Sequence, residues 1–202
     1  VALRKDGKET LLGSGQHFIS WNVNVQEDPA WNPEDIRVLF QEQDVMLNPR
    51  AKEALAAATH IIIDPGHTYG SILPTLESLS LGNEQVLHES KAQIAVVMTL
   101  LTTPLHTVGW EGEDFVRVYE SYLKRPVDFV VANTGRVDVD LVPGQAWVDF
   151  SSEDHPYTLE RVNVVRKVTS SQQTSDVVPR AVLVHDDQAM NQLFRTYLTG
   201  SK

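Results

Sequence analysis

The residues from position 64 to position 71, Asp-Pro-Gly-His-Thr-Tyr-Gly-Ser, are of the kinds that bind anions at a turn. They follow the isoleucine run Ile61–Ile63, which predicts a strand buried on both faces and ended by the Pro-Gly pair. Ser71 is the expected N-cap of the helix that comes next. The first N–H groups of a helix are unpaired and carry partial positive charge, which favours phosphate. We predict ligand contacts from five residues of this turn: Gly66, His67, Thr68, Tyr69 and Ser71.

Polar residues also follow the next two strands that the sequence predicts. Thr102 and Thr103 lie in a threonine-rich loop after one of them, and Asn133 and Thr134 come directly after the other. The carboxyl ends of parallel strands meet at one edge of a sheet, so we predict that all four residues line the same cleft as the first turn. Each pair has a simpler alternative. The threonines would only cap the following helix, and the asparagine would only bond to neighbouring backbone.

Histidines on two of these loops could converge. His67 and His106 would then bind phosphate, move a proton, or coordinate a metal together with Asp64. The alternative is that each histidine is merely solvated, and the predicted site includes no metal. His185 and Asp186 close the last predicted strand and cap the last helix. The sequence contains no Ser-His-Asp motif, no His-Glu-x-x-His motif and no Walker lysine loop.

The strands and helices that must position these loops alternate along the sequence, which predicts an α/β fold. Buried strands at 61–63, 94–98 and 128–132 alternate with helical segments, of which 112–124 is clearly amphipathic, so two βαβ units and a Rossmann-like parallel sheet flanked by helices are expected. The N-terminal residues 1–12 predict a hairpin around an Asp-Gly turn. Residues 137–175 are irregular, with strands expected at 145–149 and 162–168. A strand at 181–185 and a helix end the chain.

Composition excludes several classes of function. The chain has 202 residues and a formal net charge of −10, and no cluster of Lys and Arg, so a nucleic-acid partner is not expected. There are no cysteines, which excludes disulfides and thiolate zinc sites and is compatible with a reducing cytoplasm. No apolar stretch approaches the roughly 18 residues of a membrane span. The first residue is Val1, and the chain is expected to be a fragment, a processed product or a trimmed chain.

The first turn resembles that of the CofD-like family, and in particular its YvcK branch. The sequence of this turn in the family is Gly-Pro-Gly-Ser-Leu-Tyr-Thr-Ser-Ile-Leu-Pro-Asn-Leu. Matching positions in register are Pro65, Gly66, Tyr69, Ser71, Ile72, Leu73, Pro74 and Leu76. The threonine loop is similar to the family's second loop, with matches at Leu100, Thr102, Pro104, Thr107 and Gly109. The family's Asn, Gln and Glu are replaced here by Thr99, Thr103 and His106.

The resemblance implies a single CofD/YvcK-like α/β domain over residues 1–202 that lacks the N-terminal part with the family's Gly-Gly-Thr-Gly loop. It implies a cytoplasmic, nucleotide-sugar (UDP-sugar) binding regulatory protein of cell shape and carbon metabolism. One alternative is a CofD-like 2-phospho-L-lactate transferase that moves a phospholactyl group onto a deazaflavin and would use Mg; otherwise no cofactor is evident. A second alternative is a fragment without activity of its own. Expected partners are a nucleotide sugar or another phosphorylated small molecule, and a second copy or a separate N-terminal half. No membrane partner is expected.

Overall fold

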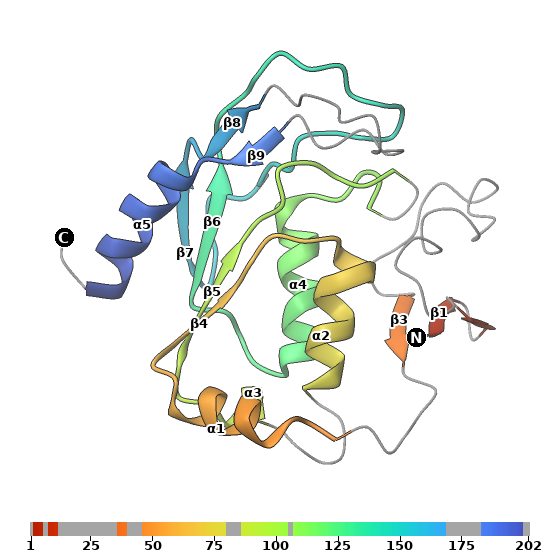
Figure 1. Cartoon of the computed structure of the whole chain (residues 1–202). Helices are drawn as coiled ribbons and strands as arrows, with labels where there is room; N and C mark the ends of the chain where they lie inside the picture. The colour runs from red at the N-terminus through yellow and green to blue at the C-terminus, as the bar shows by residue number, and fades with distance from the viewer. Residues whose placement is uncertain are drawn as a thin grey trace, which may run out of the picture.

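A parallel four-stranded sheet forms the centre of the molecule (Figure 1). The computed structural model describes residues 2–5, 8–11, 36–39, 46–79, 86–104, 107–168 and 183–199. The strands β4 (His60–Ile63), β5 (Gln93–Val97), β6 (Phe129–Asn133) and β7 (Thr158–Val162) are adjacent in that order, and every neighbouring pair is parallel. The predicted α/β fold with a parallel sheet is therefore confirmed. In the described part of the chain, no helix is both long and apolar enough to span a membrane.

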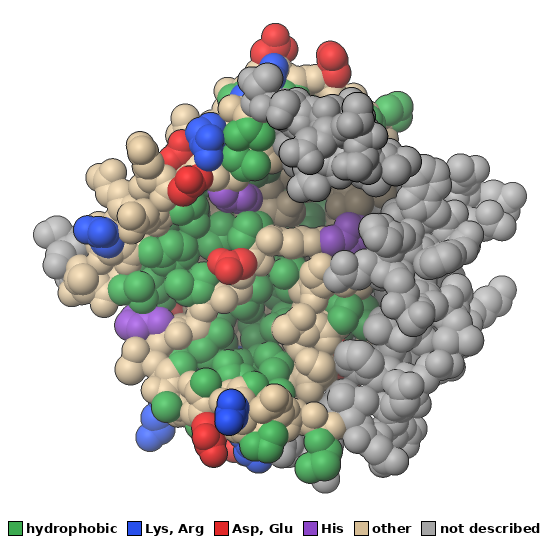
Figure 2. All heavy atoms as spheres, in the orientation of Figure 1, with side chains coloured by type: hydrophobic (Ala, Val, Ile, Leu, Met, Phe, Trp, Pro, Cys, Tyr) green, Lys and Arg blue, Asp and Glu red, His purple; other side chains and the backbone are tan. Residues whose placement is uncertain are grey.

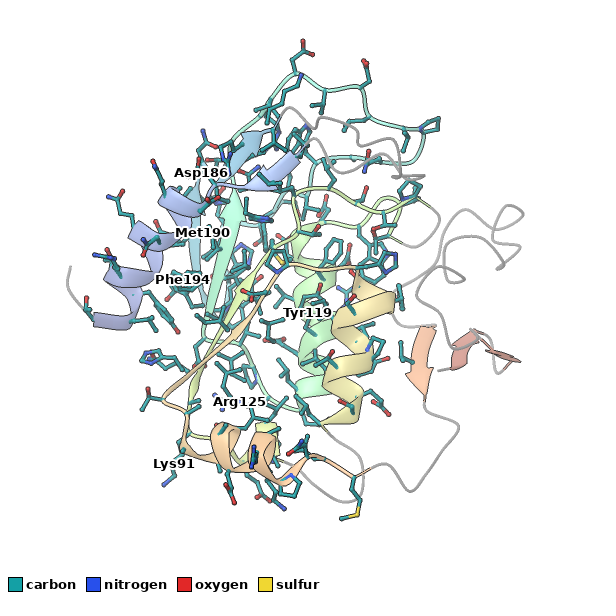
Figure 3. The ribbon with its side chains drawn as sticks, in the orientation of Figure 1. Lys91, Tyr119, Arg125, Asp186, Met190 and Phe194 are labelled. Atoms are coloured by element: carbon teal, nitrogen blue, oxygen red, sulfur yellow. The ribbon has the colours of Figure 1, made fainter. Side chains whose placement is uncertain are left out.

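Helices cover both faces of this sheet. On one face lie α2 (Leu73–Ser78) and α4 (Gly112–Leu123), and on the other lies α5 (Asp187–Thr199) (Figure 1). The α4 helix has the predicted amphipathic face, since its aromatic residues and valines are buried in the larger core cluster. Met190 and Phe194 of α5, four residues apart on one helical face, pack against a second cluster on the opposite face of the sheet (Figure 3). Each face of the sheet thus has its own apolar layer.

The first strand of this sheet is less buried than predicted. Ile63 is only 8% exposed, but Ile62 is 37% exposed. The reason is position, because β4 is the end strand of the described sheet and α5 does not extend over it far enough to cover Ile62. The prediction that this strand is central and buried on both faces is wrong.

The helix after β4 also begins earlier than predicted. A wide π-type turn, Thr68–Ile72, runs directly into α2, and its N-cap is His67 rather than Ser71. The Gly70 N–H donates to Nδ1 of His67 at 2.9 Å, which satisfies one of the unpaired groups at the helix start. The sequence rule favours Ser over His as a cap, and here the tertiary position of the ring overrides it.

A small antiparallel sheet packs beside α2 (Figure 1). It has the order β2-β1-β3, with β1 at Ala2–Lys5, β2 at Lys8–Leu11 and β3 at Ile36–Leu39. Pairing of β1 with β2 confirms the predicted hairpin. The Val38 N–H donates to the hydroxyl of Tyr122 on α4 at 2.7 Å and attaches this sheet to the core. The partial alternation of apolar residues at 17–25 also predicts a strand, and this segment lies outside the described residues.

Two short helices close the end of the sheet opposite the polar loops (Figure 1). The sequence also predicts a helix that Asn48 caps and Pro49 begins, and α1 (Pro49–Ala57) confirms it, since the Arg50 N–H donates to the side chain of Asn48 at 2.9 Å. The sequence also predicts helical structure over 83–90, and within it the structure describes the helix α3 (Val86–Glu89).

The segment after β6 differs most from prediction. Residues 145–149 form no strand, and only a single bridge joins Trp147 to Leu101. Beyond β7, the strand β8 (Val165–Lys167) pairs antiparallel with β9 (Leu183–His185). The last strand therefore exists as predicted, but it belongs to a separate two-stranded sheet instead of the parallel one. Asp186 then caps α5, as predicted.

Candidate functional site

An open cleft of about 820 Å³ lies beyond the carboxyl ends of β4 and β5. The first turn contributes Pro65, Gly66 and His67, and the threonine loop contributes residues 99–104. The opposite wall comes from residues 138–141, Gln145 and the small β8–β9 sheet. Open α/β sheets place their ligands at this edge, so the cleft lies where the sequence predicts a site. We refer to it below as the cleft.

Gly66 and His67 of the first turn line the cleft as predicted. A Cβ atom on Gly66 would lie 3.1 Å from Cδ1 of Ile72, so the backbone here passes close to the following helix. Burial lowers the pKa of His67, which favours the neutral ring. In that form Nδ1 accepts from Gly70 and the ring proton is on Nε2.

The other three residues predicted at this turn do not line the cleft. Thr68 is 3% exposed and hydrogen-bonds to Tyr119, and Tyr69 is 0% exposed with its ring 6.0 Å from that of Trp110. Burial strongly raises the pKa of Tyr69. Ser71 lines a separate groove beside β4. These side chains hold the turn against the core, which explains why the sequence pattern around Gly66 contains large residues that point away from the cleft.

Both threonines predicted from the second loop line the cleft, but they are not equivalent. Thr102 is 1% exposed, and its hydroxyl accepts the Ala146 N–H at 2.8 Å, so it joins the two walls of the cleft. Thr103 is partly exposed and donates its N–H to the hydroxyl of Thr107 at 2.7 Å. Thr103 is therefore the better placed of the two to contact a ligand. His106 lies outside the described residues.

Asn133 and Thr134 do not line the cleft. Asn133 is 7% exposed, and its side chain accepts the N–H groups of Gly135 and Val164 at 3.0 and 3.1 Å while donating to the Gly135 carbonyl at 2.8 Å. Thr134 is exposed elsewhere on the surface. The simpler alternative from the sequence, an asparagine that bonds neighbouring backbone, describes this residue.

Several lining residues come from the segment whose structure the sequence left irregular. Asp138 and Asp140 bring carboxylates to the cleft, and Lys167 of β8 brings an ammonium group whose Nζ donates to the Asp138 carbonyl at 2.6 Å. The alternation of apolar and acidic residues at 137–141 could have indicated these aspartates, because an alternating segment exposes one polar face.

His185, at the end of β9, is a further lining residue. Its Nε2 lies 3.0 Å from the carbonyl oxygen of Met98. A carbonyl only accepts, so Nε2 carries the proton and, in the neutral ring, Nδ1 is an acceptor. Burial lowers the pKa of His185, against smaller opposite effects of the Met98 bond and the Asp64 charge, and this favours the neutral ring.

The described residues of the cleft lining therefore offer one ammonium group, two carboxylates, two imidazoles and threonine hydroxyls. This set suits a polar, phosphorylated molecule with several hydroxyl groups better than an apolar one. Within the described residues, no three His, Asp or Glu side chains gather closely enough to hold a metal ion.

Comparisons with known proteins agree with this fold. The sequence profile of the family described as 2-phospho-L-lactate transferase CofD matches residues 2–178. A crystal structure of protein BH3568 from Bacillus halodurans, a member of the UPF0052 family, superposes with a TM-score of 0.67 at 17% identity. The match covers 96% of this chain and 58% of that chain, and it bears on the fold alone.

Sequence relatives carry a different name. The gluconeogenesis factor of Listeria innocua is 33% identical over 107 residues, which are 52% of this chain and 33% of that protein. A protein of Thermotoga maritima provisionally named a gluconeogenesis factor is 32% identical over 116 residues, which are 55% of this chain and 36% of that protein. The matched region thus spans about a third of the length of these relatives.

Proposed function

The chain belongs to the CofD family, and from that premise we propose that it forms part of a binding site for a nucleotide-diphosphate sugar. It would act as a YvcK-type regulatory protein of carbon metabolism and cell shape, which binds its ligand without converting it. We place this function in the cytoplasm, with which a chain without cysteines is compatible. The gluconeogenesis-factor names of the sequence relatives support the YvcK-type assignment over other members of the family.

The composition of the cleft is the observation that carries this proposal. Backbone at Gly66, the partly exposed Thr103 and the ammonium group of Lys167 all face one cavity that is large enough for a nucleotide sugar. Lys167 would pair with a phosphate, while the carboxylates of Asp138 and Asp140 would accept from sugar hydroxyls. Lys167 and the aspartates share one wall of the cleft, so the diphosphate is expected to extend from Lys167 towards Gly66, away from the carboxylates that repel it.

Affinity for the 202-residue chain alone is expected to be weak. A diphosphate is normally held by several convergent backbone N–H groups at a glycine-rich turn, and this sequence lacks the family's Gly-Gly-Thr-Gly loop. Hydrogen bonds to a charged group contribute about 1.5–3 kcal/mol each. Losing two of them moves a micromolar site towards millimolar.

NMR titration of the 15N-labelled chain with UDP-N-acetylglucosamine tests the proposal, because it detects weak binding and locates it. We expect saturable shifts at the amides of Gly66 and Thr103 with a dissociation constant of about 1 mM. Lys167→Gln should weaken binding about tenfold. Lys91→Gln, at the opposite end of the sheet (Figure 3), is the matched control and should not change it.

Two results would refute this proposal. One is the absence of shifts around the cleft at about 10 mM ligand, well above the expected constant. The other is an equal response to N-acetylglucosamine without the nucleotide diphosphate, which would leave Lys167 without a role. Low-micromolar binding by the chain alone would instead show that the glycine-rich loop is dispensable and that our placement of the diphosphate is wrong.

The family match favours one alternative function, a 2-phospho-L-lactate transferase acting on a deazaflavin. Mg would assist such a transfer by neutralising charge on the phosphoryl group. Asp138 and Asp140 are the only acidic residues of the described cleft lining, and Mg would take its other ligands from the substrate phosphate and from water. Incubation with a phospholactyl donor, the deazaflavin and Mg, followed by mass spectrometry, separates the two functions. Appearance of a phospholactyl-deazaflavin would establish the transferase.

A further inference from the structure

His185 uses only one of its two ring nitrogens within the described part of the chain. Its Nε2–H donates at 3.0 Å to the carbonyl oxygen of Met98, the residue that follows β5. Its Nδ1 is an acceptor in the neutral ring, and it has no hydrogen-bond partner among the described residues. The residue is partly exposed and lines the cleft, and histidine side chains reach the surface on this face of the molecule (Figure 2). His185 therefore offers an unused acceptor to whatever the cleft binds.

The backbone around His185 is fixed on both sides. Within the small β8–β9 sheet, His185 is opposite Val165. The N–H of the next residue, Asp186, donates to the Val164 carbonyl at 2.7 Å, and the Asp186 side chain caps α5 (Figure 3). Because the ring is also bonded to the Met98 carbonyl, the position of Nδ1 is set before a ligand arrives and little freedom is lost on binding.

The register of the β8–β9 sheet places His185 beside Lys167. Lys167 is opposite Leu183, two residues before His185, and side chains two residues apart on a strand share one face. His185 and Lys167 are thus diagonal neighbours on the same face, with their Cα atoms about 7–8 Å apart. Both line the cleft. A ligand whose phosphate pairs with Lys167 would bring the group bonded to that phosphate close to His185.

An acceptor discriminates among the groups of a phosphorylated ligand. Phosphate oxygens also accept, so they would meet the lone pair of Nδ1 with repulsion, whereas a hydroxyl group donates to it. At His67 the reverse holds, because Nδ1 already accepts the Gly70 N–H at 2.9 Å and Nε2 carries a proton that suits a phosphate oxygen. The two imidazoles of the cleft therefore suit different parts of one ligand.

We propose that Nδ1 of His185 accepts a hydrogen bond from a hydroxyl group of a sugar ring bonded directly to the phosphate at Lys167, and that this contact determines specificity. The inference rests on the function proposed above, because it requires a phosphorylated sugar in the cleft. A nucleotide-diphosphate sugar has such a ring at each end of its diphosphate, the ribose and the second sugar. A ligand without the hydroxyl should bind more weakly, because it leaves Nδ1 unpaired.

Nitrogen-15 NMR of the imidazole rings tests the contact in the wild-type chain. The probe is UDP-glucose, whose second sugar carries only hydroxyl groups as donors. At saturation we expect the Nδ1 signal of His185 to move to lower chemical shift while the proton stays on Nε2. The Nδ1 signal of His67 gives the reference for a nitrogen that already accepts. Inorganic pyrophosphate has no sugar hydroxyl and should not move the Nδ1 signal of His185.

Two further ligands identify the sugar. UDP lacks the second sugar, and 2′,3′-dideoxy-UDP also lacks the ribose hydroxyls. A shift that appears with UDP-glucose but not with UDP places the hydroxyl on the second sugar. A shift that appears with UDP and is lost with the dideoxy compound places it on the ribose. A shift that the dideoxy compound retains would come from an N–H of the base and would overturn the proposal.

His185→Gln separates this role from a purely structural one. The glutamine amide can still donate to the Met98 carbonyl, but it places no acceptor where Nδ1 lies. We expect UDP-glucose to bind about three- to tenfold more weakly, with a free energy of unfolding close to that of the wild type. His88→Gln makes the same change at an exposed position of α3, at the opposite end of the sheet (Figure 1), and as the matched control it should alter neither quantity.

Four results would overturn the proposal. They are a proton on Nδ1 of His185 in the free chain, an equal Nδ1 shift with pyrophosphate, equal affinity of a folded His185→Gln variant, and an Nδ1 signal that stays in place while the amide signals of Gly66 and Thr103 saturate. The last result would leave the function proposed for the cleft intact. If neither the amides nor Nδ1 respond to UDP-glucose, that function is refuted and this inference with it. Should His185→Gln not fold, the wild-type spectra decide.

Discussion

Replacement of Asn133 by Ala should destabilise the protein strongly while leaving the cleft intact. The Asn133 side chain makes three hydrogen bonds, to the N–H and C=O of Gly135 and to the N–H of Val164. Val164 is 1% exposed, so its N–H would lose its partner without gaining water. Each bond contributes about 1–1.5 kcal/mol, and an unpaired buried group costs about 1–3 kcal/mol. We expect a loss of about 3–5 kcal/mol, a large part of the stability of a typical domain.

Urea unfolding followed by circular dichroism measures this loss. Thr134→Ala changes the exposed neighbour of Asn133 and should lower the free energy of unfolding by less than about 0.5 kcal/mol. A loss below about 1.5 kcal/mol for Asn133→Ala would show that its three hydrogen bonds stabilise the protein much less than we expect. If Asn133→Ala weakened ligand binding without changing the free energy of unfolding, the structural role would be refuted and Asn133 would be a ligand contact.

Three further predictions concern the helices and the histidines. Asp186→Ala should lower the free energy of unfolding by about 1 kcal/mol in urea titrations, because Asp186 accepts two N–H groups at the start of α5; an unchanged midpoint would contradict its role as a cap. Gly112→Ala should lower the free energy of unfolding by about 1–3 kcal/mol, because the added Cβ would overlap the ring of Phe150. A melting temperature equal to that of the wild type would show that the ring can move aside. Burial lowers the pKa values of His67 and His185 in the folded protein, so the unfolded state binds protons more readily. The free energy of unfolding should therefore be highest above about pH 6.5 and fall as the pH decreases below it. Unfolding titrations at several pH values test this, and a stability that rises between pH 6.5 and 5 would reverse our assignment of neutral rings.

The sequence predicted three of the four described strands of the parallel sheet, because these three are short apolar runs with clear ends, but it did not predict β7. Ile94–Met98 and Asp128–Ala132 correspond closely to β5 and β6, and the amphipathic pattern of α4 agrees with its buried face. Sequence periodicity reports burial of a segment, but it does not report the position of a strand in the sheet. The isoleucines of β4 therefore predicted a central strand, whereas β4 lies at the edge of the sheet that the described residues form.

The cleft could be predicted only in part, because half of its lining depends on contacts between distant segments. Gly66, His67, Thr102 and Thr103 follow directly from strand ends, and all four line it. Lys167 reaches it because β8 pairs with β9, which lies beyond a long segment, and no local pattern encodes that pairing. The type of a polar residue at a strand end also does not tell whether it contacts a ligand or bonds to the protein itself. Asn133 is of the second kind, since it bonds to Gly135 and Val164.

The all-parallel arrangement of the sheet has a consequence for how the chain acquires its structure. His60 is opposite Gln93, Ala95 is opposite Phe129, and Phe129 is opposite Thr158, so every pairing closes a loop of about 30 residues. No two neighbouring strands of this sheet can form a local hairpin that nucleates the rest. The entropy of loop closure must be lost before any strand gains its partner, which slows folding to the millisecond range or beyond. Until the last crossover is complete, the apolar strands remain open to pairing with other chains, so newly made protein depends on rapid closure of these loops to escape aggregation.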